Sequence, residues 1–227
     1  MTLHQQQQVS VIDTIENEIK NNSLSFSTVS PVTDFEKDER ICLTSVHLPK
    51  ENLIFKIHKI INALKEAEPE YYYYPDNSLH MTIKNIRVIN DPPHFTSEDI
   101  SKAETVFAKV IGNHKKFAAY FYRLLLFPNN LALIGTTDPE FDTLFLDLDQ
   151  ELKEAGISDD KQYSNSAYFF SNMTLARFPI ITKQFKEKVA EVSKTLIFEP
   201  YIVDSVTLLS CNAVLKKRHI IDTWKLT

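Results

Sequence analysis

Residues 78–83 read Ser-Leu-His-Met-Thr-Ile, and residues 172–178 read Asn-Met-Thr-Leu-Ala-Arg-Phe. In each stretch a polar residue stands two positions before a threonine. Because side chains alternate across a strand, His80 and Thr82 share one face of an expected strand, and the asparagine and threonine of the second stretch likewise share a face. The residues between them are apolar. Both stretches therefore predict a strand that packs one face on a core and lines a wet groove with the other.

The two stretches occupy matching places in a repeat. Ile41, early in one expected strand, lies 39 residues before His80, and Leu131, early in another, lies 41 residues before Asn172. Each half of the chain is expected to run strand, helix, strand, helix, strand. This order predicts an α+β fold of two pseudo-symmetric lobes, each an antiparallel sheet backed by helices, with a central groove between them.

Helical periodicity and turn residues give the expected boundaries. The expected strands span residues 41–48, 78–88, 117–127, 131–136, 167–178, 202–211 and 218–224, and the expected helices span residues 51–67, 97–111, 141–155 and 182–194. A hairpin is expected across Pro128-Asn129-Asn130. Residues 1–38 are expected to be a peripheral N-terminal extension, with a short amphipathic helix over 9–20 and a loop over 21–33. Residues 39–227 are expected to form a single bilobal domain.

Composition excludes several classes of protein. Hydrophobic residues make up 43% of the chain and charged residues 24%, which is usual for a globular domain, and no apolar run is long enough to span a membrane. With three glycines, the chain has no phosphate-binding loop or dinucleotide fingerprint. Its two cysteines form no disulfide framework or zinc cluster, so we expect a reducing, cytoplasmic location. A net charge of −5 predicts that any nucleic-acid ligand is short and bound in a local pocket.

The two stretches resemble the His-X-Thr motifs of the two-histidine (2H) phosphoesterase superfamily, which includes 2′-5′ RNA ligase-like proteins and cyclic phosphodiesterases. The resemblance covers roughly residues 40 to 225 and departs from the family at Asn172, where the family has histidine. It implies an enzyme that acts on a 2′,3′-cyclic phosphate or a 2′-5′ phosphodiester of a nucleotide or short RNA. It also implies no metal and no cofactor. We expect a monomer that needs no protein partner and no membrane.

The resemblance assigns roles to four residues. His80 is the acid or base that exchanges a proton, and Thr82 and Thr174 bind the phosphate. Asn172 can donate a hydrogen bond to the phosphate, but it cannot exchange a proton near pH 7. Losing one acid or base typically slows a reaction by about 10² to 10⁴. A histidine displaced from the motif could restore the missing group, and His47, at the end of the first strand, is the first candidate, with His219 the second.

Other residues are candidates for binding substrate. Lys84 shares the face of His80 if the strand alternates regularly, and would add positive charge to the groove. Arg177 lies on the face opposite Thr174 under the same rule, and reaches the groove only if the strand has a bulge. Tyr74 and Tyr168 belong to aromatic runs that precede the two motifs, and either ring could stack on a base. Most aromatic residues of these runs are expected to pack in the core.

Three functions stay open on the sequence. The first is a phosphoesterase that works with His80 and a reduced second site. The second is a catalytically degenerate module that binds the phosphate of a nucleotide or RNA without turnover. The third is a structural protein with a vestigial groove. The retained threonines favour the first two, and Asn172 favours the module over the enzyme.

Overall fold

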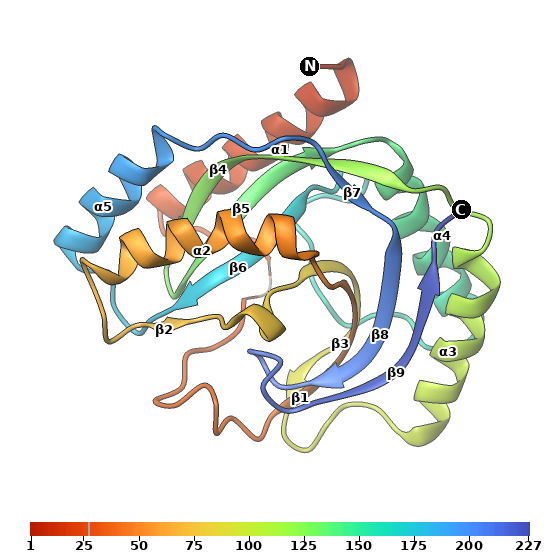
Figure 1. Cartoon of the computed structure of the whole chain (residues 1–227). Helices are drawn as coiled ribbons and strands as arrows, with labels where there is room; N and C mark the ends of the chain where they lie inside the picture. Colours follow the sequence, from red (N-terminus) through yellow and green to blue (C-terminus); the bar gives the residue numbers. More distant parts are fainter. Residues whose placement is uncertain (27) are drawn as a thin grey trace.

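The computed structural model describes residues 1–26 and 28–227, and Figure 1 shows them as two antiparallel sheets with helices packed around them. The helices are α1 (Leu3–Lys20), α2 (Glu51–Lys65), α3 (Ser97–Ile111), α4 (Glu140–Glu154) and α5 (Lys183–Ser193), with a short 3-10 helix at Asp76–Ser78. The strands are β1 (Ile41–His47), β2 (Tyr72–Tyr73), β3 (Met81–Asn90), β4 (Phe117–Phe127), β5 (Asn130–Thr137), β6 (Ser171–Arg177), β7 (Tyr201–Val203), β8 (Ser205–Cys211) and β9 (Arg218–Lys225). The predicted α+β architecture of two sheets is confirmed.

The two sheets exchange strands between the halves of the chain. One sheet has the order β3-β1-β8-β9 and the other has the order β2-β6-β5-β4-β7. β4, from the first half, pairs with β5, because the tight turn at residues 128–130 joins them as a hairpin. β8, from the second half, pairs with β1. Each sheet is therefore built from strands of both halves of the chain. The two lobes are joined more closely than two independent repeats would be.

Several strand boundaries differ from the sequence prediction. β3 begins at Met81 rather than residue 78, because the 3-10 helix after Pro75 occupies residues 76–78. β6 begins at Ser171, and the expected strand over 202–211 is divided at Asp204, where the chain passes from one sheet to the other. The two-residue strand β2 was not predicted, because its tyrosines have no alternating pattern.

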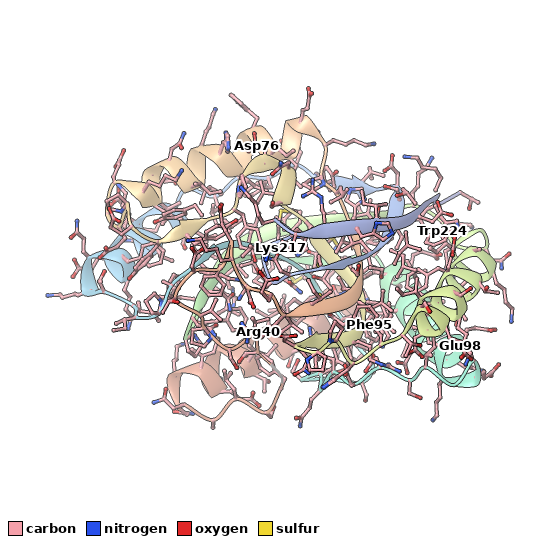
Figure 2. All side chains as sticks on the ribbon, turned by 90° about the horizontal axis from the view of Figure 1, so that it is seen from below. Arg40, Asp76, Phe95, Glu98, Lys217 and Trp224 are labelled. Carbon is pink, nitrogen blue, oxygen red and sulfur yellow. The ribbon has the colours of Figure 1, made fainter. Side chains whose placement is uncertain are left out.

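Helices cover the outer face of each sheet (Figure 1). α2 and α5 lie on the five-stranded sheet, and α3 and α4 lie on the four-stranded sheet. Leu131 and Leu133 of β5 belong to the main core, which includes the buried faces of these helices. Figure 2 shows Trp224 on β9, at the edge of the four-stranded sheet. Its ring lies 5.8 Å from that of Phe107 on α3. The inner faces of the two sheets are thus left to form the groove.

Helix α1 packs on the inner face of the five-stranded sheet. It begins earlier than predicted, because Thr2 and Gln5 form a capping box at its N-terminus. Ile12 and Ile15 contact a second apolar cluster that includes Ala132, and alternation along β5 puts Ala132 on the face opposite Leu131 and Leu133. The N-terminal helix therefore covers part of the same sheet face that lines the groove.

The segment before β1 crosses the turn between β8 and β9. Lys217 forms an ion pair with Glu39, and Lys216 Nζ lies 3.4 Å from Glu36 Oε2. Figure 2 shows Arg40 and Lys217 on this side of the molecule. The basic run of the turn therefore pairs with acidic residues of the N-terminal segment. Within the described residues, no helix has the length and apolar character that crossing a membrane requires.

Gly135 occupies a position in β5 where a larger residue does not fit. A Cβ added there would lie 2.7 Å from the backbone oxygen of Tyr120 and 2.7 Å from Ser171 Oγ, whereas a Cβ at Gly112 would meet nothing within 4 Å. We predict that Gly135→Ala lowers the free energy of unfolding by about 1 to 3 kcal/mol, because the backbone of β4 must move. The matched Gly112→Ala variant should be unchanged or more stable by about 0.4 to 1 kcal/mol. Urea denaturation measures both, and equal effects would contradict the predicted close approach of β4 and β5.

Candidate functional site

Each motif strand contains a one-residue bulge directly after its threonine. In β3, Thr82 pairs with Val46 and Lys84 pairs with Ser45, which leaves Ile83 without a partner residue on β1. In β6, Thr174 and Ala176 pair with neighbouring residues of β5, which leaves Leu175 extra. A bulge shifts the alternation of side chains by one position. The residue three positions after each threonine therefore turns to the threonine's face.

The bulges give the two strands equivalent triplets of groove residues. On β3 and just before it these are His80, Thr82 and Asn85, and on β6 they are Asn172, Thr174 and Arg177. All six line one pocket, which we call the polar pocket; it also includes Cys42, Thr44, Lys161, Cys211 and Asn212. The structure thus brings the four residues of the two motifs together, and it adds Asn85 and Arg177 at matching places.

His80 presents one ring nitrogen to the polar pocket. Its Nδ1 lies 2.8 Å from the carbonyl oxygen of Ser78, which can only accept, so Nδ1 carries the proton of the neutral ring and Nε2 has a free lone pair. Burial and, to a smaller extent, the nearby charges of Arg177 and Arg218 together lower the pKa of His80 to about 4, against the opposing effect of the Ser78 hydrogen bond. At pH 7 His80 is therefore neutral and able to accept a proton.

Arg177 is held rigidly and carries an uncompensated charge. Its Nε donates to Tyr74 Oη at 2.9 Å, and Tyr74 donates in turn to the carbonyl oxygen of Ala213 at 2.8 Å. The guanidinium carbon lies 5.5 Å from the centre of the Phe35 ring. Among the described residues no carboxylate forms an ion pair with Arg177, although its side chain is buried. A fixed, unpaired cation at the wall of a pocket favours binding of an anion.

The remaining motif side chains have unused hydrogen-bonding groups. Within the part of the chain that the structure describes, the side chains of Thr82, Asn172 and Thr174 form no hydrogen bond with another residue, and each is partly exposed in the pocket. Two hydroxyl groups and one amide are therefore available to a ligand, on two strands that face each other. Donors of this kind beside an unpaired arginine suit the oxygens of a phosphate group.

An aromatic pocket adjoins the polar pocket. The aromatic pocket shares Thr82, Asn172, Thr174 and Arg177 with the polar pocket. It extends over rings of the N-terminal region, of β4, of α4 and of the segment before β6: Phe26, Phe127, Phe145, Tyr163, Tyr168, Phe169 and Phe170. Ile15 of α1 also lines it, so the N-terminal helix closes one end. Tyr168 is thus placed in a pocket, as proposed from the sequence, with its ring 6.0 Å from that of His4.

Three residues proposed from the sequence, Lys84, His47 and His219, do not reach the groove. Lys84 is turned to the other face by the bulge at Ile83, where its buried ammonium pairs with Asp159 and lies 2.6 Å from Asp149 Oδ1. The expectation that Lys84 shares the face of His80 is therefore wrong, because alternation was assumed to be regular.

His47 also lies outside both pockets. Its Nδ1 is 2.9 Å from the carbonyl oxygen of Ser205 and its Nε2 is 2.9 Å from Tyr201 Oη, so both nitrogens are used inside the protein. Burial also lowers the pKa of His47. His219 is exposed on β9, away from both pockets. Neither histidine lines the polar or the aromatic pocket.

Tyr74 has a different role from the one proposed. Its side chain is 2% exposed and holds Arg177, while its ring packs 5.9 Å from that of His80. It therefore orients two groove residues and offers no free face on which a base could stack. Burial in this aromatic run also raises the pKa of Tyr74.

Several groove residues were missed from the sequence. Asn85 could have been found, because it stands at the same offset from its threonine as Arg177. Cys42 and Cys211 are directly opposite on β1 and β8, with their Sγ atoms 3.5 Å apart, and both line the polar pocket. Lys161 lies on the loop before β6, and no sequence pattern marked it. Among the described residues, no group of three histidine, cysteine or acidic side chains could hold a metal ion.

Solved structures supply the comparison for this arrangement. Escherichia coli LigT without ligand superimposes with a TM-score of 0.56 at 13% identity, over 84% of this chain and 99% of that chain. The chain has the LigT fold. A protein described as a phosphoesterase superimposes with a TM-score of 0.52 at 13% identity, over 84% of this chain and 99% of that chain. LigT complexed with 3′-AMP superimposes with a TM-score of 0.52 at 15% identity, over the same shares of the two chains. The sequence matches no family model and no curated protein.

The buried ion pairs of Lys84 lead to a prediction about stability. Lys84→Met keeps the aliphatic stem but leaves Asp159, whose side chain is 9% exposed, without its partner. We expect the free energy of unfolding to fall by about 3 kcal/mol, because an uncompensated buried charge is costly. Urea denaturation of this variant beside Lys153→Met, a change at an exposed lysine on α4, measures the effect. Equal stability of the two variants would contradict a structural role for Lys84.

Proposed function

We propose that the chain is a phosphoesterase that acts on a 2′,3′-cyclic phosphate or a 2′-5′ phosphodiester of a nucleotide or short RNA. The observation that carries this proposal is the convergence of His80, Thr82, Thr174 and Arg177 on one pocket from two facing strands. A neutral histidine can serve as the general base of phosphodiester hydrolysis, and two free hydroxyl groups and an unpaired arginine can bind the phosphate oxygens. The LigT fold, which occurs in a protein crystallised with 3′-AMP and with ATP, agrees with a nucleotide ligand.

In this proposal the groove residues have separate roles in binding the phosphate and in transferring the proton. The hydroxyl groups of Thr82 and Thr174 donate hydrogen bonds to the non-bridging oxygens of the phosphate, and Arg177 balances the charge that grows on them. His80 accepts, through Nε2, the proton of the attacking water as its oxygen bonds to phosphorus. The Ser78 carbonyl holds the ring in the tautomer that this step requires.

The aromatic pocket gives the nucleoside a place beside the phosphate. Its rings, Tyr168 among them, lie directly next to the shared residues Thr82 and Thr174. Stacking of a base on an aromatic side chain contributes about 1 to 3 kcal/mol. Because α1 closes this pocket at Ile15, a mononucleotide or the end of a short RNA fits the groove better than a long strand.

A second candidate is a module that binds the same ligand without turning it over. Asn172 favours it, because an amide cannot exchange a proton with the leaving oxygen near pH 7. The two candidates share the phosphate pocket and differ in turnover alone. Measuring binding and hydrolysis on the same preparation therefore separates them.

The first test is hydrolysis of 2′,3′-cyclic AMP. We expect His80→Ala to lower kcat by about 10² to 10⁴, because the general base is lost. Since His80 acts in its neutral form, kcat/KM should stay high as the pH falls below 6.5 and decline only near pH 4, where His80 gains a proton. The exposed His219→Ala variant serves as the control and should match the wild type. Turnover that persists in His80→Ala would contradict the assigned base.

The second test is binding of 3′-AMP by isothermal titration calorimetry. Replacing both groove threonines by valine in the double variant Thr82→Val and Thr174→Val keeps their shape and removes two donors to a charged group, each worth about 1.5 to 3 kcal/mol. We expect affinity to fall by at least about tenfold, since 1.4 kcal/mol corresponds to a factor of ten. Thr105→Val, on the exposed face of α3, is the matched control. Unchanged affinity in the double variant would show that the phosphate binds elsewhere.

A further inference from the structure

Lys161 lines both pockets at a site whose second motif has no histidine. It belongs to the loop between α4 and β6 and lines the polar and the aromatic pocket together with Asn172 and Thr174. The loop therefore brings a cation into the groove that the two motif strands line.

The ammonium of Lys161 has no partner in the described part of the chain. No hydrogen bond or ion pair involves its Nζ, and its nearest recorded contact is the Tyr163 ring, whose centre is 5.4 Å away. Its neighbour Asp159 accepts a hydrogen bond from the backbone N–H of Lys161, but the other carboxylate oxygen pairs with Lys84. An ammonium that is largely buried, unpaired and open to a pocket has its donors available for a ligand.

The surroundings of Lys161 also tune its proton affinity. Burial lowers its pKa to about 8, and the positive charge of Lys84 acts in the same direction, while Asp159 and Cys42 oppose them. Lys161 is therefore still mostly protonated at pH 7 but releases its proton far more readily than an exposed lysine. This is the property that a general acid requires.

We propose that Lys161 is the general acid of the site and performs the proton transfer that a histidine at position 172 would otherwise perform. The inference rests on the proposed phosphoesterase function. In hydrolysis of a 2′,3′-cyclic phosphate, the water oxygen bonds to phosphorus and its proton passes to His80. The bond between phosphorus and one ribose oxygen breaks, and a proton from Lys161 Nζ neutralises that oxygen. Asn172, beside it, donates a hydrogen bond and exchanges no proton.

The test compares two leaving groups in the Lys161→Arg variant, which keeps the positive charge but cannot release a proton near neutral pH. For 2′,3′-cyclic AMP, whose leaving group is an alkoxide, kcat should fall by about 10² to 10⁴. For a nucleoside 4-nitrophenyl phosphodiester, whose leaving group needs no proton, kcat should change by less than about tenfold, because the lost acid contributes little there. Lys153→Arg, at an exposed lysine, is the matched control.

Two further measurements separate an acid from a cation that only binds. In the wild type, kcat/KM for 2′,3′-cyclic AMP should decline above about pH 8, as Lys161 loses its proton, and Lys161→Arg should abolish this decline. Adding Asn172→His to Lys161→Arg should restore turnover of the cyclic substrate, because it supplies a histidine in the pocket that Lys161 lines.

Each other outcome overturns the inference. Equal losses on both substrates would mean that Lys161 serves binding or folding, and no loss on either would mean that it is not the acid. In both cases the proposed function stands if His80→Ala still abolishes turnover. Absence of turnover by the wild-type protein, with 3′-AMP still bound, would overturn Lys161 as an acid and favour the binding module.

Discussion

The one-residue bulges at Ile83 and Leu175 are the constraint on which the site depends. Without them, regular alternation would point Lys84 and Ala176 into the groove and bury Asn85 and Arg177 in the opposite face. With them, each strand presents three groove residues at the same offsets, and Arg177 reaches the polar pocket from β6. A bulge is a local departure from the ladder that re-aims a single side chain, and it is used here twice at equivalent places.

Positive charge is concentrated in the groove of a chain that is acidic overall. The net charge is −5, yet Arg177 and Lys161 line the pockets without a carboxylate partner among the described residues. Keeping buried cations unpaired costs stability, and that cost is recovered only when an anion binds. By contrast Lys84, which is buried more deeply than Lys161, is neutralised by Asp149 and Asp159. Lys84 has carboxylate partners, as a structural lysine does, whereas Lys161 has none within residues 1–26 and 28–227 and is available to a ligand.

Much of the fold could be predicted from the sequence, because the relevant signals are local. The helix over 97–111 was predicted to the residue, and the hairpin at residues 128–130 follows from its turn residues. The pairing of β8 with β1 was not predicted, because a repeat in the order of elements does not specify which edges pair. The hairpin joins the two halves of the chain and thereby places β4 in the same sheet as β5.

The site was predictable where it follows strand alternation and was not where it depends on tertiary contacts. His80, Thr82, Asn172 and Thr174 converge as the two motifs suggested. The prediction for Lys84 was wrong because of the bulge at Ile83, which the strand propensities of these residues do not indicate. His47 is held outside the groove by hydrogen bonds with Tyr201 and Ser205, which lie more than 150 residues away in the chain. Lys161 comes from a loop, where sequence gives no direction to a side chain.

The central claim is that two facing strands form one anion site. A crystal structure of the protein grown with 3′-AMP tests it most directly. The account predicts phosphate density within hydrogen-bonding distance of the Thr82 and Thr174 hydroxyl groups and the Arg177 guanidinium, with His80 Nε2 facing it. A nucleotide whose phosphate is ordered elsewhere on the protein, with only water between the two threonines, would contradict it.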